Sequence, residues 1–117
     1  MDLELKALEL ENKAKRAKDQ GNYEEAAKFY IDASEIYRQI GDEKNCKWNL
    51  ANYHSRMGTN YSHTNEFDKA RESFKKAEEL FLELNLREPA FVCASDYVRT
   101  FHACSVKKPI VPSTSLV

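Results

Sequence analysis

Histidine is the side chain that most often ligates metals or transfers protons near neutral pH. The chain contains three, His54, His63 and His102. A tetrahedral metal site needs four ligands, and sequence-readable sites place histidine, cysteine or carboxylate ligands at short spacings. His54 and His63 are nine positions apart and poorly aligned on a helix, and no cysteine or carboxylate completes a four-ligand set by spacing. We therefore expect no metal ion and no other cofactor.

The candidate nucleophiles are the three cysteines, Cys46, Cys93 and Cys104. Cysteine catalysis needs a thiol activated by a neighbouring base or by a lowered pKa. Cys104 has His102 and Asp96 close by in sequence, but this grouping has no signature of a nucleophile with its base. Cys93 and Cys104, eleven positions apart on one expected helix, fit small packing residues better. We therefore expect no catalytic residue and no enzyme.

The amino-acid composition indicates in which cellular compartment the protein works and which class of partner it binds. An odd number of cysteines without metal-type spacing favours a reducing, cytoplasmic location. The formal net charge of −1, from 18 basic and 19 acidic residues, gives no overall attraction to nucleic acid or to an anionic membrane. We expect no signal peptide at the N-terminus and no membrane insertion, since no window approaches roughly 18 apolar residues. The expected partner is a protein or peptide.

A repeat of 44 residues supplies the elements that would position these side chains. The matched pairs are Gly21/Asn65, Tyr23/Phe67, Ala26/Ala70, Tyr30/Phe74, Ala33/Ala77, Ile36/Leu80, Tyr37/Phe81, Ile40/Leu84 and Gly41/Asn85. Aromatic residues match aromatic residues, and alanine matches alanine. Self-similarity at a fixed period predicts stacked supersecondary units rather than one globular core.

Apolar residues at helical spacing predict about five helices. We expect them at about 3–20, 23–40, 43–63, 66–84 and 89–105. Turn-forming residues such as Gly21 and Gly41 separate them, because glycine tolerates the left-handed conformation that ends helices. Gly58 lies inside the third helix and is a weak point in it. The alternation of alanine with aromatic residues suits antiparallel helix packing and predicts an all-α fold.

The spacing Gly21-x-Tyr23-x-x-Ala26-x-x-x-Tyr30-x-x-Ala33, repeated from Asn65 onward, resembles the second helix of a tetratricopeptide repeat. The period of 44 exceeds the usual length of about 34 and resembles the long-helix variety of kinesin-light-chain and soluble-NSF-attachment-type proteins. The resemblance covers about residues 7–85. It implies antiparallel helix hairpins stacked into an α–α superhelix, and a concave groove that binds a peptide or helix of a partner.

The resemblance also implies a domain organisation. One helical repeat domain would span 1–106, with units at about 3–41 and 42–85 and a cap or partial third unit at 88–105. The residues after it, 107–117, include two prolines and three hydroxyl residues, and we expect a disordered tail or a linker. If they are a linker, the chain is the N-terminal adaptor or regulatory segment of a larger protein, an alternative that stays open.

In this family the first helix of each pair lines the groove, and residues outside the repeated motif make the binding contacts. Carried over position by position, this implies Lys15, Lys18, Asn52, Ser55, Thr59, Ser62 and His63. Asn52, Ser55 and Thr59 follow i, i+3, i+7, so they share one helix face that would hydrogen-bond a peptide backbone. The alternative is a plain solvated face without a ligand.

Two apolar features are further candidate contacts. Trp48, the only tryptophan, fits either a buried packing residue between units or an exposed anchor for a partner. The expected fifth helix carries Phe91, Val98 and Phe101 on an apolar face, which predicts docking or self-association to a homo-oligomer. Whether the groove or the fifth helix carries the binding stays open.

Overall fold

The computed structural model describes residues 2–107, and this part of the chain contains five α helices. They are α1 (Leu3–Asp19), α2 (Tyr23–Gln39), α3 (Glu43–His63), α4 (Phe67–Glu83) and α5 (Arg87–Lys107). The predicted all-α class is confirmed, and every helix limit lies within two residues of its expected position. Lys107 ends α5, and the rest of the predicted tail, 108–117, lies outside the described residues.

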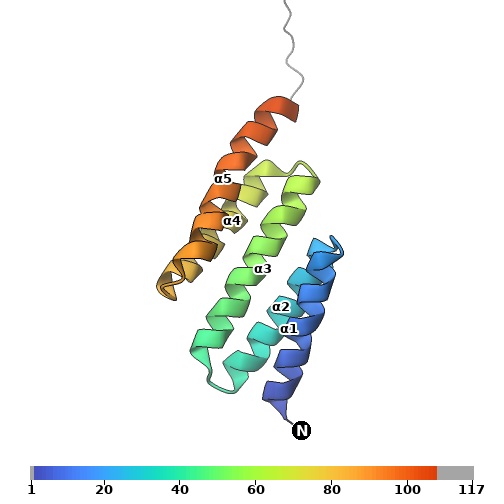
Figure 1. The fold of residues 1–117 in the computed structure, drawn as a ribbon, viewed down its shortest axis with the longest axis vertical. Coiled ribbons are helices and arrows are strands. Elements are labelled where there is room, and N and C mark those ends of the chain that lie inside the picture. Colours follow the sequence, from blue (N-terminus) through green and yellow to red (C-terminus); the bar gives the residue numbers. More distant parts are fainter. Residues whose placement is uncertain (1, 108–117) are drawn as a thin grey trace, which may run out of the picture.

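The helices form two layers (Figure 1). In the view of Figure 1, α1, α3 and α5 make a front layer, with α2 and α4 behind them. Each helix packs extensively against the next one along the chain, from α1 with α2 to α4 with α5. The chain is therefore an array of helix hairpins in which α3 is the central member of the front layer.

Every connection between helices contains one residue in the left-handed conformation. These residues are Gly21 (φ 82°), Gly41 (φ 80°), Asn65 (φ 62°) and Asn85 (φ 60°). Glycine and asparagine adopt positive φ at the least cost, which explains why these two types recur at the repeat boundaries. The following amide then closes the helix end: the Asp42 nitrogen donates to the Tyr37 carbonyl oxygen at 2.9 Å, as in a Schellman motif.

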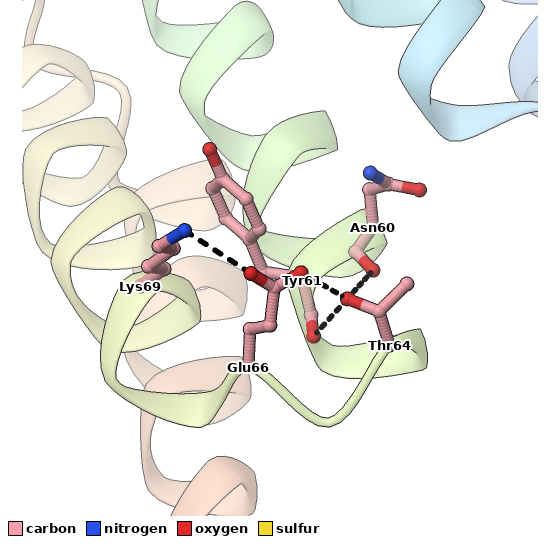
Figure 2. Close-up of polar contacts among 5 residues, drawn as sticks. All are labelled: Asn60, Tyr61, Thr64, Glu66 and Lys69. Carbon is pink, nitrogen blue, oxygen red and sulfur yellow. Dashed lines mark hydrogen bonds and ion pairs between the residues drawn. The ribbon is translucent and has the colours of Figure 1, made fainter.

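Side chains also hold the turn between α3 and α4 (Figure 2). The Thr64 hydroxyl oxygen lies 2.6 Å from Glu66 Oε2 and 3.1 Å from the Tyr61 carbonyl oxygen. The other Glu66 carboxylate oxygen accepts a 3.1 Å hydrogen bond from Lys69 Nζ. The Thr64 bond first, and Lys69 second, hold the pKa of Glu66 below its ordinary value. These contacts fix the end of α3 that carries His63.

Alanines packed against aromatic rings form the core. The buried alanines are Ala7, Ala14, Ala17, Ala26, Ala27, Ala33, Ala51, Ala70, Ala77 and Ala90. Tyr30 and Tyr37 of α2 and Phe74 and Phe81 of α4 fill the space between them and are only 2–3 % exposed. Small residues let helices approach closely while the rings fill the gaps, as the alternation in the sequence predicts.

Candidate partner-binding surface

Two hollows lie along α3, one near each of its ends. The first, of about 250 Å³, we call the α3–α5 cleft; it is lined by Thr59, Ser62, His63, Phe74, Asp96, Arg99, Thr100 and Ala103. The second, of about 220 Å³, we call the α1–α3 hollow; it is lined by Glu11, Lys44, Asn45, Trp48, Leu84 and Leu86. Apart from Phe74 of α4, the residues that line both hollows come from helices of the front layer and from the turn after α4. The surface of the front layer is thus the candidate site.

The α3–α5 cleft brings together three of the residues expected to bind a partner, Thr59, Ser62 and His63. The Thr59 hydroxyl donates to the Ser55 carbonyl oxygen at 3.2 Å, which leaves its own oxygen free to accept a hydrogen bond. The exposed His63 ring lies edge-on to Tyr23, with ring centroids 5.2 Å apart. Polar groups of α3 are therefore held in fixed positions along one wall.

The opposite wall of the cleft comes from α5 and is charged. Asp96 and Arg99 form an ion pair, with Arg99 Nη1 3.1 Å from Asp96 Oδ1. Burial raises the pKa of Asp96, and the positive charges of Arg99 and then Arg56 oppose that rise. Thr100 donates to the Tyr97 carbonyl oxygen at 2.6 Å. This wall offers both signs of charge at close range.

The two remaining residues of the expected binding face, Asn52 and Ser55, differ in burial. Asn52 is half-buried, and its Nδ2 donates to the Trp48 carbonyl oxygen at 2.9 Å. Ser55 is only 3 % exposed and accepts a 2.8 Å hydrogen bond from Arg56 Nη2. It lies against α5, where burial raises the pKa of Cys93 to about 11 and the Ser55 hydroxyl partly offsets the rise. The Ser55 hydroxyl therefore does not reach the surface of the front layer.

Arg56 is a half-buried cation that the sequence analysis did not single out. It shares a helix face with Asn52 and His63, since the three follow i, i+4, i+11. Within residues 2–107 its guanidinium takes part in no ion pair, and its buried Nε atom has no hydrogen-bond partner. The equivalent positions of the repeat, 44 residues before and after Arg56, hold the polar residues Asn12 and Thr100. This recurrence of polar residues is the sequence signal that could have identified the position.

Trp48 packs between helices and keeps part of its surface accessible. Its half-buried side chain packs against the cluster that contains Ala51 and Phe81, and its ring lies edge-on to Tyr30, with centroids 6.1 Å apart. The remaining surface lines the α1–α3 hollow. Lys15 and Lys18 are exposed on α1. Trp48 is therefore a packing residue with an accessible edge.

The apolar residues expected on the fifth helix are exposed on α5. Phe91, Val98 and Phe101 are 73 %, 64 % and 51 % exposed. Phe101 also lies beneath the Arg71 guanidinium, 4.4 Å from its carbon to the ring centroid, and edge-on to Tyr97. These contacts turn Phe101 towards α4, whereas Phe91 and Val98 face away from the rest of the described chain.

The histidines and cysteines are dispersed over the described residues. No three His, Cys, Asp or Glu side chains between residues 2 and 107 are grouped so that they could hold a metal ion. Cys46, Cys93 and Cys104 are all free thiols. None of the helices in this part of the chain is both long and apolar enough to span a bilayer.

The comparison with known families decides what the array is. The sequence model of the family described as tetratricopeptide repeat matches residues 7–83, well over half of the chain. The chain belongs to the tetratricopeptide repeat family. Among curated proteins and solved structures, no match reaches significance.

Membership places the protein in a functional class. Tetratricopeptide repeats are non-catalytic helical repeats that mediate protein–protein interactions. The matched residues run from α1 to the end of α4, so two helix hairpins carry the family's pattern and α5 follows them. The closer likeness to long-helix repeats stays a prediction.

Proposed function

We propose that the front layer of this tetratricopeptide array binds an extended peptide or a helix of a partner protein, with Arg56 at the centre of the contact. The observation that carries the proposal is the state of Arg56, half-buried and outside every ion pair of the described chain. A guanidinium offers five N–H donors in a planar fork that matches a carboxylate. A ligand carboxylate would complete this site.

The neighbours of Arg56 support a peptide as the ligand. Asn52, Thr59 and His63 lie on the same helix, and α3 rises 1.5 Å per residue, so Asn52 and His63 are separated by about 16 Å along the axis. An extended chain rises about 3.3 Å per residue, so this distance corresponds to about five peptide residues. Each of these side chains has a polar atom that a peptide backbone can engage.

Lys15 and Lys18 extend the proposed surface onto α1. Both are exposed, and both stand 44 positions before residues that line the α3–α5 cleft, Thr59 and Ser62. Their charges add to that of Arg56, so the proposed ligand carries acidic residues. Electrostatic complementarity of this kind raises association rates and selects among partners.

Selection from a library of short random peptides tests the proposal. We expect the full chain to enrich peptides that contain Asp or Glu. A synthetic peptide from that selection should bind Arg56→Gln about tenfold or more weakly than wild type, because one charge-assisted hydrogen bond contributes about 1.5–3 kcal/mol. Lys28→Gln, which removes an exposed positive charge from α2 outside the proposed surface, is the matched control and should leave the affinity unchanged. Equal affinities for wild type and Arg56→Gln would refute the proposed role of Arg56.

A further inference from the structure

α5 presents an apolar stripe to solvent. Phe91 and Val98 are 73 % and 64 % exposed. Together with Ser95 and His102 they follow i, i+4, i+7, i+11, which places the four on one face of the helix. Val92, 53 % exposed, borders this face. We call Phe91, Ser95, Val98 and His102 the α5 stripe.

The repeat aligns the α5 stripe with a face that is buried on α3. The α3 residues 44 positions earlier are Lys47, Ala51, His54 and Gly58. This is the face that packs on α4: Lys47 Nζ lies 3.2 Å from Glu83 Oε1, and Gly58 is buried against the ring of Phe74. The α5 stripe therefore occupies the position at which a first helix of a hairpin meets its second helix.

Nothing in the described chain covers the α5 stripe, and the residues that follow do not repeat the pattern of α2 and α4. Pro109 stands where Gly21 and Asn65 begin the pattern, and Thr114 stands where it has alanine. Proline at the start and the loss of the alanine remove the features that define α2 and α4. The sequence pattern of 108–117 therefore does not predict another helix of the α2 and α4 type.

The residues of the stripe also differ from those of α3 in a way that suits another occupant. At the level where α3 has Gly58, which accommodates an aromatic ring, α5 has the larger His102. At the levels of the polar Lys47 and His54, α5 has Phe91 and Val98. The stripe is therefore more apolar than its α3 counterpart but does not leave room for the Phe74-type ring of a repeat helix.

We propose that a second copy of this chain covers the α5 stripe, with the two α5 helices packed antiparallel about a two-fold axis beside Ser95. In this register Phe91 of one copy packs at the level of Val98 of the other, and small Ser95 lies at the crossing point. The Glu88 carboxylate of one copy reaches the level of the His102 imidazole of the second copy, which can donate a hydrogen bond to it. The two α5 helices then run antiparallel to each other, as the two helices of each hairpin do.

The exposed area supports a modest dimer rather than a permanent one. Taking roughly 150–250 Å² for an aromatic side chain and somewhat less for valine, Phe91, Val92 and Val98 expose on the order of 300 Å² per copy. A standard interface buries about 800 Å² per partner, including a polar rim. An exposed apolar patch of about 300 Å² is comparable to the largest patch on a typical monomer, about 300–600 Å², and such patches are often interaction sites. We therefore expect dimerisation in the micromolar range of concentration.

Sedimentation equilibrium of the full chain between about 1 and 200 µM tests the proposal, since this range brackets micromolar dissociation constants. We expect the average mass to rise from monomer towards dimer, and Phe91→Glu to raise the dissociation constant at least about tenfold. Leu82→Glu, at an exposed leucine of α4 with 51 % exposure, is the matched control and should dimerise like wild type. A wild-type chain that stays monomeric throughout this range, or a Phe91→Glu variant that dimerises as well as wild type, overturns the proposal.

Cross-linking tests the register separately from the affinity. In a chain with Cys46→Ala and Cys104→Ala, we expect Ser95→Cys to form a covalent dimer under mild oxidation, because residue 95 faces its own counterpart across the two-fold axis. Glu24→Cys, exposed on α2, should stay monomeric under the same conditions. If both variants cross-link equally, or if Ser95→Cys does not cross-link in a chain that dimerises, the proposed packing of α5 is wrong.

Discussion

Gly58 of α3 lies directly against the ring of Phe74 of α4. A Cβ atom added at Gly58 would stand 2.6 Å from Cε1 of that ring, closer than side chains approach one another. The helix nevertheless continues without interruption from Glu43 to His63. The corresponding pair in the first hairpin is Ala14 and Tyr30, both buried. The glycine therefore permits close packing of α3 on α4 and does not break the helix.

This contact predicts the effect of Gly58→Ala. Alanine gains about 1 kcal/mol of helix propensity over glycine, but forcing a methyl group into a filled site costs about 1–3 kcal/mol. Because Phe74 is only 3 % exposed, its ring has little room to move. We expect a net destabilisation of up to about 2 kcal/mol in urea unfolding. In a Phe74→Leu background the same substitution should cost nothing or stabilise; a stabilising effect of Gly58→Ala in the wild-type background would contradict this packing.

The left-handed turn residues lead to a second prediction. Asn65 has φ 62°, a conformation that costs a residue with a Cβ about 1–2 kcal/mol. We expect Asn65→Ala to destabilise the fold by about 1 kcal/mol and Asn65→Gly to leave it unchanged or slightly more stable. Asn22→Ala is the control, since Asn22 has φ −90° and no side-chain capping bond. Equal thermal stabilities of Asn65→Ala and Asn65→Gly would show that the backbone does not need the left-handed conformation there.

His54 makes stability depend on pH. Burial first, and the charge of Lys76 second, lower the pKa of His54 from its ordinary value of 6.5. The unfolded chain therefore binds a proton more readily than the folded chain, so stability falls as the pH drops below 6.5 and stops falling below the folded-state pKa. NMR titration of the His54 imidazole should give a midpoint below 6.5, and His54→Gln should remove this part of the pH dependence. A midpoint at or above the ordinary value would contradict the burial of the ring.

The reactivity of the Cys93 thiol tests the prediction that the chain has no catalytic cysteine. Burial raises the pKa of Cys93 to about 11, which leaves almost no thiolate near neutral pH. We expect iodoacetamide to leave Cys93 unmodified in the native chain, and to modify it as soon as urea unfolds the protein. Mass spectrometry of the digested chain reports each cysteine separately. Rapid native alkylation of Cys93 would indicate an activated thiol and would reopen the possibility of an enzyme.

The sequence predicts the array well because its signals are local. Helix limits follow from apolar spacing and from turn residues such as Gly41, whose conformation the sequence type itself favours. The side chains of the surface are harder to predict because their exposure depends on the neighbouring helix. Spacing alone puts Ser55 beside Asn52 and Thr59, but α5 buries it. Arg56 was missed because nothing in its own helix reveals that it lacks a charged partner.

The central claim is that the front layer, around Arg56, is the surface that binds a partner. The most direct test is NMR chemical-shift mapping of the full chain during titration with an acidic peptide selected on it. We predict that the largest shifts fall on Asn52, Arg56, Thr59 and His63, and that the exposed face of α2 around Lys28 does not respond. Shifts centred on the α2 and α4 layer or on the α5 stripe, with α3 unaffected, would contradict the account.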